Sequence, residues 1–185
     1  MGAIVITGVP GVGKSTVINA ASEATKFKVV VYGTEMFQLA KERGLVEHRD
    51  AMRTLPPETQ RELQEAAAKR IAAMGDVIVD THCTIKTPRG FLPGLPEWVA
   101  KGLDLRQIIL VEATPQEIAN RRAKDATRVR DEDKPEAIDE HQRQNRYAAW
   151  AVATLTGATV ATVLNHDGKV EQAKEAVIKA LAGRP

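Results

Sequence analysis

The sequence has few of the residues that cross-links, metal clusters and membrane spans require. Of its 185 residues only Cys83 is a cysteine, so no internal disulfide and no multi-cysteine zinc site can form. Its apolar runs are far shorter than the roughly 20 residues needed to cross a bilayer, and the amino terminus has no basic signal region. We therefore expect a soluble, cytoplasmic protein with no membrane partner.

The chain also lacks an excess of charge and of aromatic side chains. Lys and Arg number 26 and Asp and Glu 24, which leaves a net charge of +2, and only 4% of the residues are aromatic. Attraction to nucleic acid through bulk charge needs a strongly basic surface. The composition thus predicts no nucleic-acid partner, and any phosphate chemistry must depend on where individual arginines lie.

What the sequence does contain is an alternation of short apolar runs and amphipathic stretches. Strands are expected at residues 3–7, 28–32, 77–80, 107–111 and 159–164, and helices at 34–43, 57–74, 115–124, 136–155 and 170–181, with a further helix through Val17, Ile18 and Ala21. The segment 84–96, which has three prolines and two glycines, is expected to be a loop. Continuous apolar strands separated by helices predict one α/β domain over residues 1–185. It should hold a three-layer, mostly parallel five-stranded sheet with ligands beyond the carboxyl ends of its strands.

One motif fits a phosphate-binding loop in full. The run GVPGVGKS at residues 8–15 follows an expected strand and opens an expected helix. Its glycines let backbone N–H groups face phosphates, Lys14 would reach the β- and γ-phosphates, and the Ser15 hydroxyl would face Mg²⁺. Asp80, at the end of the strand 77–80, is expected to orient the same ion. The predicted ATP-binding residues are Gly8, Val9, Pro10, Gly11, Val12, Gly13, Lys14, Ser15 and Thr16.

The second half of the chain carries a group of arginines. They are Arg121, Arg122, Arg128, Arg130, Arg143 and Arg146. Guanidinium groups can stabilise the negative charge that phosphoryl transfer spreads over the reacting oxygens. Any one of them can instead form an ordinary surface ion pair, such as Arg143 with Asp139. The polar segment 125–135 is interpreted as a lid that would bring Arg128 and Arg130 over the phosphates and exclude water.

Taken together, these motifs resemble the nucleoside monophosphate kinases, and specifically the archaeal type of adenylate kinase. The resemblance covers essentially the whole chain and rests on GVPGVGKST, YGTEMFQLAKERGLVEHRDAMR, VDTHCTIKTPRGFLPGLP, RRAKDATRVRDED and IDEHQRQNRYAA. It implies a P-loop kinase fold with a helical monophosphate-binding region at about residues 32–74 and a short lid at about 125–135. It also implies the reaction of ATP and AMP to two ADP with Mg²⁺, and a homotrimer.

The resemblance assigns roles to particular residues. Lys14, Arg121, Arg128 and Arg130 would be catalytic. Thr34 would contact AMP, and Arg53 or Arg49 would hold its phosphate, with Arg53 the preferred choice. Arg89 is a second candidate for the same phosphate. Position 38 is Gln where bacterial relatives carry a phosphate-binding arginine, so that role is not transferred.

Two alternative functions stay open at the level of sequence. One is a kinase for another nucleoside monophosphate or for a small molecule with a hydroxyl group, in which Asp80 would accept the hydroxyl proton. The other is an adenylate-kinase-like ATPase that acts as an assembly factor. AMP itself needs no general base, because a phosphate monoester has a second pKa of about 6 and is already nucleophilic at pH 7.

Overall fold

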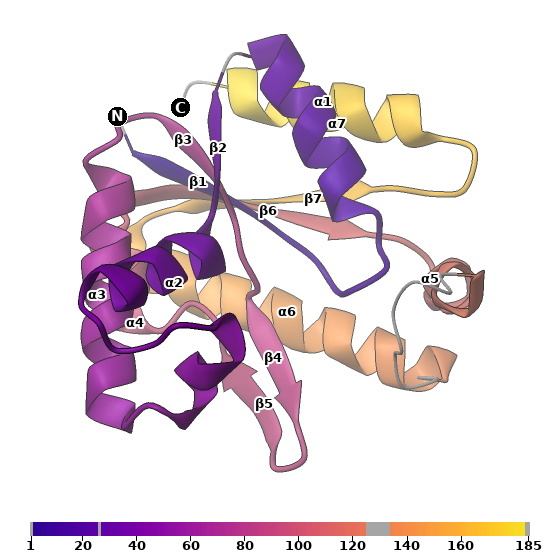
Figure 1. Cartoon of the computed structure of the whole chain (residues 1–185). Coiled ribbons are helices and arrows are strands. Elements are labelled where there is room, and N and C mark those ends of the chain that lie inside the picture. Colours follow the sequence, from indigo (N-terminus) through magenta and orange to yellow (C-terminus); the bar gives the residue numbers. More distant parts are fainter. Residues whose placement is uncertain (1, 26, 125–133, 184–185) are drawn as a thin grey trace.

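The fold is the three-layer α/β architecture that the sequence predicts. The computed structural model describes residues 2–25, 27–124 and 134–183 (Figure 1). Its central sheet has the strand order β2-β3-β1-β6-β7, and every neighbouring pair is parallel. The strands are β1 (Ala3–Thr7), β2 (Lys28–Val31), β3 (Val77–Asp80), β6 (Leu105–Glu112) and β7 (Thr159–Leu164).

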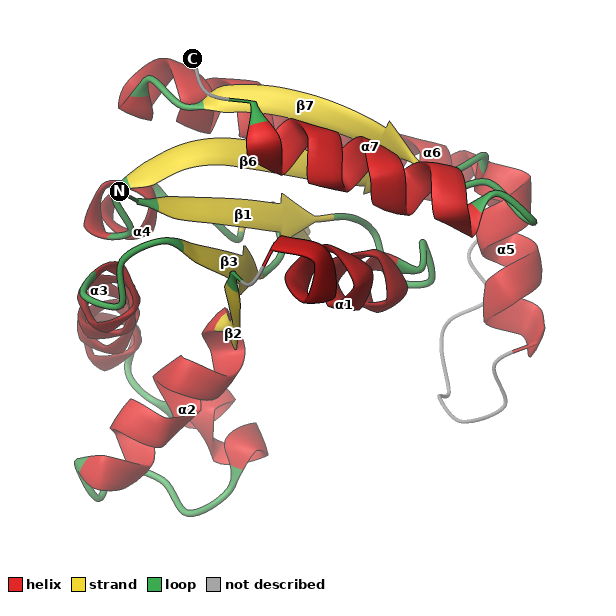
Figure 2. Cartoon of the chain, turned by 90° about the horizontal axis from the view of Figure 1, so that it is seen from above, coloured by secondary structure: helices red, strands yellow, loops and turns green. Residues whose placement is uncertain are grey.

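Helices cover both faces of this sheet. On one face lie α1 (Lys14–Thr25) and α7 (Val170–Ala182), and on the other lie α3 (Pro57–Ala72), α4 (Glu97–Gly102) and α6 (Pro135–Thr156), as Figures 1 and 2 show. The remaining helices are α2 (Tyr32–Glu42), the 3-10 helix η1 (Arg49–Thr54) and α5 (Pro115–Lys124). The predicted strand 28–32 is therefore one residue too long, because Tyr32 begins α2.

The apolar strands are explained by two separate cores. Successive strand residues point to opposite faces of a sheet. Ala3 and Val5 of β1 accordingly pack with α3, α4 and α6, while Ile4 and Ile6 pack with α1 and α7. Because both faces are buried, nearly every position in the strand must be apolar.

The prediction of a loop at residues 84–96 is wrong. This segment contains an antiparallel hairpin of β4 (Thr84–Thr87) and β5 (Gly90–Pro93), followed by the unpredicted helix α4. The hairpin is fixed at its base from α6, where the Asn145 side-chain oxygen accepts hydrogen bonds from the backbone N–H of Thr84 at 3.1 Å and from its hydroxyl at 2.6 Å. That contact joins residues far apart in the sequence, so local turn propensities could not reveal it.

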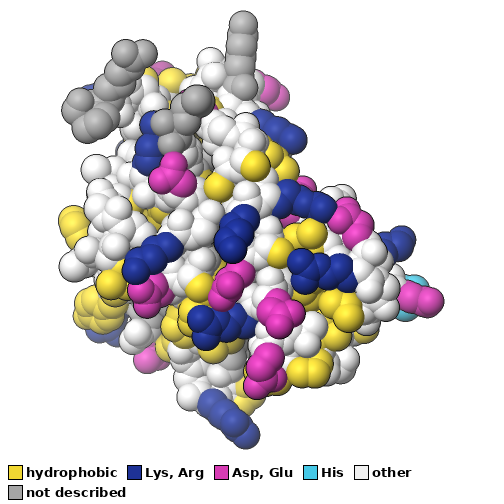
Figure 3. Space-filling model, turned by 90° about the vertical axis from the view of Figure 1, so that its left-hand side faces the viewer, with side chains coloured by type: hydrophobic (Ala, Val, Ile, Leu, Met, Phe, Trp, Pro, Cys, Tyr) yellow, Lys and Arg dark blue, Asp and Glu magenta, His cyan; other side chains and the backbone are white. Residues whose placement is uncertain are grey.

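The face of the molecule around α3 carries side chains of both charges side by side (Figure 3). Two ion pairs here are Arg61 with Glu65 and Arg70 with Glu42. This face thus has no broad patch of one sign. Within the described ranges, no helix is both long enough and apolar enough to cross a bilayer.

Candidate active site

The phosphate loop joins β1 to α1 at the carboxyl edge of the sheet. Gly11 and Gly13 adopt φ angles of 86° and 85°, which glycine tolerates without strain. A Cβ atom at residue 13 would lie 2.5 Å from the side-chain nitrogen of Asn165, so this glycine also allows a close approach. The free N–H groups at the start of α1 face the same place, and this edge can therefore bind an anion.

Lys14 is held against the end of β3. Its Nζ forms an ion pair with the Asp80 carboxylate and donates a 3.1 Å hydrogen bond to the carbonyl of Thr81. The two charged side chains are only 13% and 21% exposed. The neighbouring Ser15 hydroxyl is exposed and has no hydrogen-bonded partner among the described residues. A cation, a carboxylate and an open hydroxyl thus meet where the phosphate loop ends.

A cleft of about 860 Å³ runs from this loop toward α2 and α3. All the predicted ATP-binding residues line it except Val12, which is buried beneath the loop. Its far end is lined by Tyr32, Gly33, Met36, Arg49 and Gln64, and the hairpin contributes Ile85, Leu92 and Pro93. One cleft therefore connects the phosphate loop with the region predicted to bind the monophosphate.

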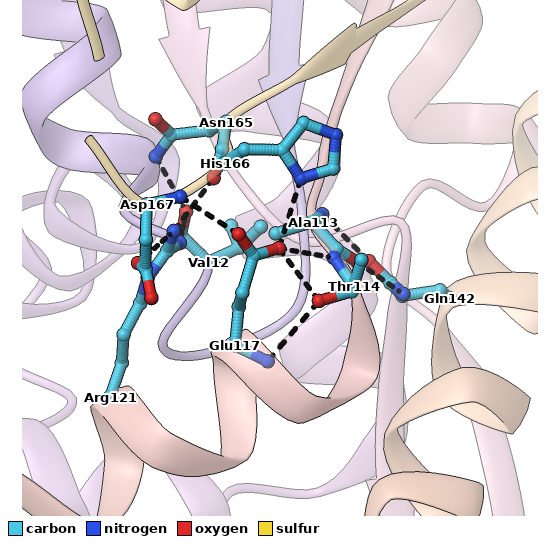
Figure 4. Close-up of polar contacts among 9 residues, drawn as sticks. All are labelled: Val12, Ala113, Thr114, Glu117, Arg121, Gln142, Asn165, His166 and Asp167. Carbon is cyan, nitrogen blue, oxygen red and sulfur yellow. Dashed lines mark hydrogen bonds and ion pairs between the residues drawn. The ribbon is translucent and has the colours of Figure 1, made fainter. Parts of the chain in front are cut away.

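Arg121 of α5 connects the phosphate loop with the loop that follows β7 (Figure 4). Its Nε donates to the Asp167 carboxylate at 2.7 Å, its Nη1 to the carbonyl of Val12 at 3.0 Å and its Nη2 to the carbonyl of Asn165 at 2.8 Å. These bonds use three of the five N–H groups of a guanidinium. Arg121 also lines the cleft, so the residue predicted to be catalytic holds the phosphate loop in place as well.

Two further side chains fix the same loop. Arg122 donates from Nε to the carbonyl of Pro10 at 2.8 Å, and Asn165 donates from its amide to the carbonyl of Val12 at 2.8 Å. Three side chains therefore hold the loop through its carbonyl oxygens. The N–H of Val12 bonds the carbonyl of Val9 at 3.2 Å, and the loop N–H groups that such contacts do not use can bind a ligand. The sequence motif gave no indication of these contacts.

Glu117 is the centre of a second polar cluster in Figure 4. It forms the predicted capping box with Thr114, in which each residue accepts a hydrogen bond from the backbone N–H of the other, at 3.0 and 3.3 Å. The same carboxylate accepts from His166 Nδ1 at 2.9 Å and from the backbone N–H of Asp167 at 2.8 Å. These donors, His166 first, hold the pKa of Glu117 well below its usual value.

The two arginines of α6 do not line the cleft. Arg146 forms two 2.7 Å hydrogen bonds to Glu112, at the end of β6, and this partner raises the pKa of Arg146. Arg143 makes the surface ion pair with Asp139 that the sequence left open, at 3.5 Å. Next to them, the Gln142 amide bonds both the N–H and the carbonyl of Ala113. This end of α6 therefore supports the sheet edge beneath the site.

His82 and Cys83 follow Asp80 and lie at different depths. His82 lines the cleft, and its pKa is lowered by partial loss of solvent and then by the charge of Lys14. Cys83 is buried, and burial raises the pKa of its thiol to about 12. Its backbone N–H donates to the Thr7 hydroxyl at 2.9 Å. The protonated thiol is a poor nucleophile, which indicates a packing role for this cysteine.

The arginines predicted for the acceptor phosphate differ in position. Arg49 lines the cleft and lies over Gly33, where a Cβ atom would come within 2.7 Å of its Nη2. Arg53 and Arg89 are exposed and do not line the cleft, and Thr34 is half-buried next to it. Of the three arginines considered for this phosphate, the structure thus brings Arg49 to the cleft. Arg128 and Arg130 lie outside the described residues.

The chain is similar over almost its whole length to curated adenylate kinases of archaea. It is 53% identical to that of Thermoplasma acidophilum over 178 residues, which cover 96% of this chain and 97% of the relative. It is 55% identical to that of Methanopyrus kandleri over 176 residues, which cover 92% of each chain. It is 51% identical to that of Methanocaldococcus jannaschii, with 96% of this chain and 97% of the relative covered.

A family profile and solved structures agree on the fold. Residues 7–139 match a family described as an AAA domain. A shikimate kinase from Bacteroides thetaiotaomicron superposes with a TM-score of 0.58 at 14% identity, covering 97% of both chains. A gluconokinase from Sinorhizobium meliloti 1021 gives 0.57 at 15% identity, covering 98% of this chain and 91% of that one. At such low identity these two structures bear on the fold alone.

Proposed function

The chain belongs to the adenylate kinase family and, through residues 7–139, to the AAA domain family, and from this premise we propose how its cleft performs the reaction. ATP binds at the phosphate loop with Mg²⁺, AMP binds at the far end of the same cleft, and transfer of the γ-phosphoryl group gives two ADP. The observation that carries the proposal is the continuity of the cleft from Lys14 to Arg49.

At the donor end we assign the predicted loop residues 8–16 to the ATP phosphates. The loop N–H groups bind the phosphate oxygens, and Lys14 exchanges its ion pair with Asp80 for the β- and γ-phosphates. Arg121 bonds the phosphate loop through one N–H and the loop after β7 through two, and we assign its remaining N–H groups to a phosphate contact. Arg128 and Arg130 complete the proposed catalytic set, as the lid arginines.

The residues at the loop suit a magnesium ion. Mg²⁺ prefers hard oxygen ligands and is usually bound through one or two protein groups together with substrate phosphates. The open Ser15 hydroxyl and the Asp80 carboxylate both line the cleft and meet this requirement. When bound, the ion neutralises charge that develops on the β- and γ-phosphate oxygens.

At the acceptor end we assign the AMP phosphate to Arg49, because it lines the cleft. The phosphate oxygen of AMP attacks without help from a base, since its second pKa of about 6 leaves it ionised at pH 7. Thr34, Arg53 and Arg89 remain predicted acceptor contacts, which would require this end of the molecule to close over the nucleotide. A homotrimer and a cytoplasmic location also belong to the proposal, the first by family resemblance and the second from the single cysteine.

A coupled assay tests the function directly. Purified protein with Mg²⁺ and ATP is expected to form ADP only when AMP is present, at two ADP for each ATP consumed. CMP, UMP and GMP serve as alternative acceptors in the same assay, and gluconate and shikimate serve as acceptors with a hydroxyl group. Equal ATP consumption with and without AMP would contradict the proposal and favour an ATPase.

A further inference from the structure

Gln64 of α3 is a polar residue in the acceptor end of the cleft that no motif singles out. It is half-buried and lines the cleft. Its backbone carbonyl accepts a 2.6 Å hydrogen bond from the hydroxyl of Tyr32, a residue that is itself only 6% exposed. The start of α2 is thus joined to α3 at this residue, which fixes the position of the Gln64 backbone.

The orientation of the Gln64 amide is fixed by Trp98 of α4. The indole Nε1 donates to Gln64 Oε1 at 2.9 Å. An indole N–H is a donor only, so the atom facing it must be the amide oxygen and the amide nitrogen must point elsewhere. Among the described residues the Nε2 group has no hydrogen-bonded partner, and it is not an enclosed, unsatisfied atom. Its two N–H groups are therefore free to donate within the cleft.

The indole is itself held in place. The Arg61 guanidinium lies 4.5 Å from the centre of the Trp98 ring, at cation–π distance, and its Nε donates to Glu65 at 3.0 Å. Trp98 also packs against the hydrophobic core to which α3 and α4 contribute. A fixed ring with a single donor leaves Gln64 one favourable amide orientation.

The cleft that Gln64 lines also has apolar lining residues, against which a flat, weakly polar ring can pack. Met36 of α2 and the hairpin residues Ile85 and Leu92 contribute apolar side chains to its lining. In ligand sites, apolar lining residues commonly provide affinity, while a few placed polar groups, here the Gln64 amide N–H groups, fix the orientation of the ligand. Adenine fits because its ring nitrogens N1, N3 and N7 all accept hydrogen bonds.

We propose that Gln64 reads the acceptor base by donating a hydrogen bond from Nε2 to a ring nitrogen of adenine, with Trp98 as the positioning residue. The assignment rests on the proposed function, since it names the group that recognises AMP in the same site. A base that presents an N–H at that point would be rejected, because two donors would then face each other without an acceptor.

The test compares AMP with its 1-deaza, 3-deaza and 7-deaza analogues as acceptors. Each analogue replaces one ring nitrogen by C–H, which cannot accept a hydrogen bond. The wild-type enzyme is expected to lose about tenfold in kcat/KM with one analogue only. Gln64→Leu is expected to lose about the same factor with AMP, through KM, and to show no further loss with that analogue. Equal losses with all three analogues in the wild-type enzyme would overturn the assignment. So would a further loss with the sensitive analogue in Gln64→Leu, added to the loss that the substitution itself causes.

Trp98→Phe separates positioning from packing. It keeps an aromatic ring over the core but removes the N–H, so the Gln64 amide can rotate. We expect a rise of about threefold in KM for AMP, weaker discrimination against the sensitive analogue, and unchanged kcat and KM for ATP. In the Gln64→Leu background the same change should leave KM for AMP as it is. A further rise there would mean that Trp98 acts only through packing.

A matched control uses the other glutamine of this helix. Gln60 is one turn earlier, and its amide donates to the carbonyl of Leu55 at 2.7 Å rather than lining the cleft. Gln60→Leu is expected to lower the melting temperature without changing the order of preference among the analogues. If wild-type protein forms no AMP-dependent ADP, the proposed function fails. If it does and Gln64→Leu keeps its KM for AMP, only the assignment of Gln64 fails.

Discussion

The two ends of the cleft are built differently. At the donor end, where we place ATP, hydrogen bonds to carbonyl oxygens of the phosphate loop come from the side chains of Arg121, Arg122 and Asn165. At the acceptor end, the exposed guanidinium of Arg49 has no hydrogen-bonded or ionic partner among the described residues. The protein therefore holds the phosphate loop in a conformation that can bind phosphate. The Arg49 guanidinium, in contrast, gains a charged partner only when a ligand binds.

This difference indicates where ligand binding must reorganise the protein. Because the phosphate loop is already ordered, ligand binding carries no free-energy cost for ordering it. More of the interaction energy is then available to stabilise the transition state. An open guanidinium must lose side-chain freedom when it binds, so part of its interaction energy is offset. We expect substitutions at the donor end to affect both stability and catalysis, and substitutions of the acceptor arginines to affect affinity alone.

Lys14→Ala should have the largest effect. It removes the charge assigned to the β- and γ-phosphates, and we expect kcat to fall by roughly 10²–10³-fold, by analogy with the loss of one group that stabilises transition-state charge. Steady-state ADP formation measures this, and circular dichroism is expected to show an intact fold. Turnover close to that of the wild-type protein would mean that the loop is not catalytic.

Arg49→Ala should have the next largest effect and should confine it to the acceptor. Loss of a charge-assisted bond to phosphate is expected to raise KM for AMP about 10–100-fold, with KM for ATP and the melting temperature unchanged. Arg53→Ala is the comparison variant, because this exposed arginine is the other candidate on the same 3-10 helix but lies outside the cleft, and we expect it to raise KM for AMP less than Arg49→Ala does. If Arg53→Ala raised KM for AMP and Arg49→Ala did not, the original preference for Arg53 would be correct.

Arg121→Ala should show the opposite profile. It removes three hydrogen bonds at the phosphate loop and the loop after β7, so we expect a loss of about 2 kcal/mol in the free energy of unfolding and a rise of about tenfold in KM for ATP. Because Arg121 is also assigned a phosphate contact, kcat should fall as well. Urea denaturation and initial rates measure the two quantities. Arg121→Lys should not restore either one, because an ammonium group cannot span the three acceptors. Unchanged stability with a fall in kcat alone would make Arg121 a phosphate ligand rather than a support for the loop.

The sequence predicted what depends on neighbouring residues and missed what depends on distant ones. The phosphate loop and the capping box of Thr114 with Glu117 are local patterns, and the structure contains both. The hairpin at residues 84–93 depends on Asn145, 61 positions away from Thr84. Local patterns therefore predicted the phosphate loop and the capping box, while the distant contacts that support them are seen only in the packed structure.

The choice between acceptor arginines shows the same limit. Arg49 and Arg53 lie on one short 3-10 helix, and both are exposed. Only the packed structure places Arg49 over Gly33, which belongs to α2 and has no side chain to block it. Composition and spacing along the chain carry no information about which of two such residues faces a cleft formed by other elements.

The smallest effect should come from Glu117, which joins α5 to the loop after β7. Glu117→Gln keeps the shape of the side chain but replaces one accepting oxygen by a donor, so at pH 7 we expect a loss of about 1 kcal/mol, or roughly 2–4 °C in melting temperature. The pKa of this carboxyl is lowered on folding, from an ordinary value of 4.5. Its stabilisation should thus be complete above that value and decrease as pH falls below it.

Thermal unfolding of both proteins from pH 7 to pH 3 measures this dependence. The difference between wild type and Glu117→Gln should be constant from pH 7 to about pH 5 and should shrink below pH 4.5, because the unfolded wild-type chain then binds a proton that the folded chain resists. Glu171→Gln on α7 is the control, since that exposed carboxylate pairs with Lys174 at the surface and should show almost no difference at any pH. A gap that widened toward low pH would mean that Glu117 is protonated more readily in the folded state.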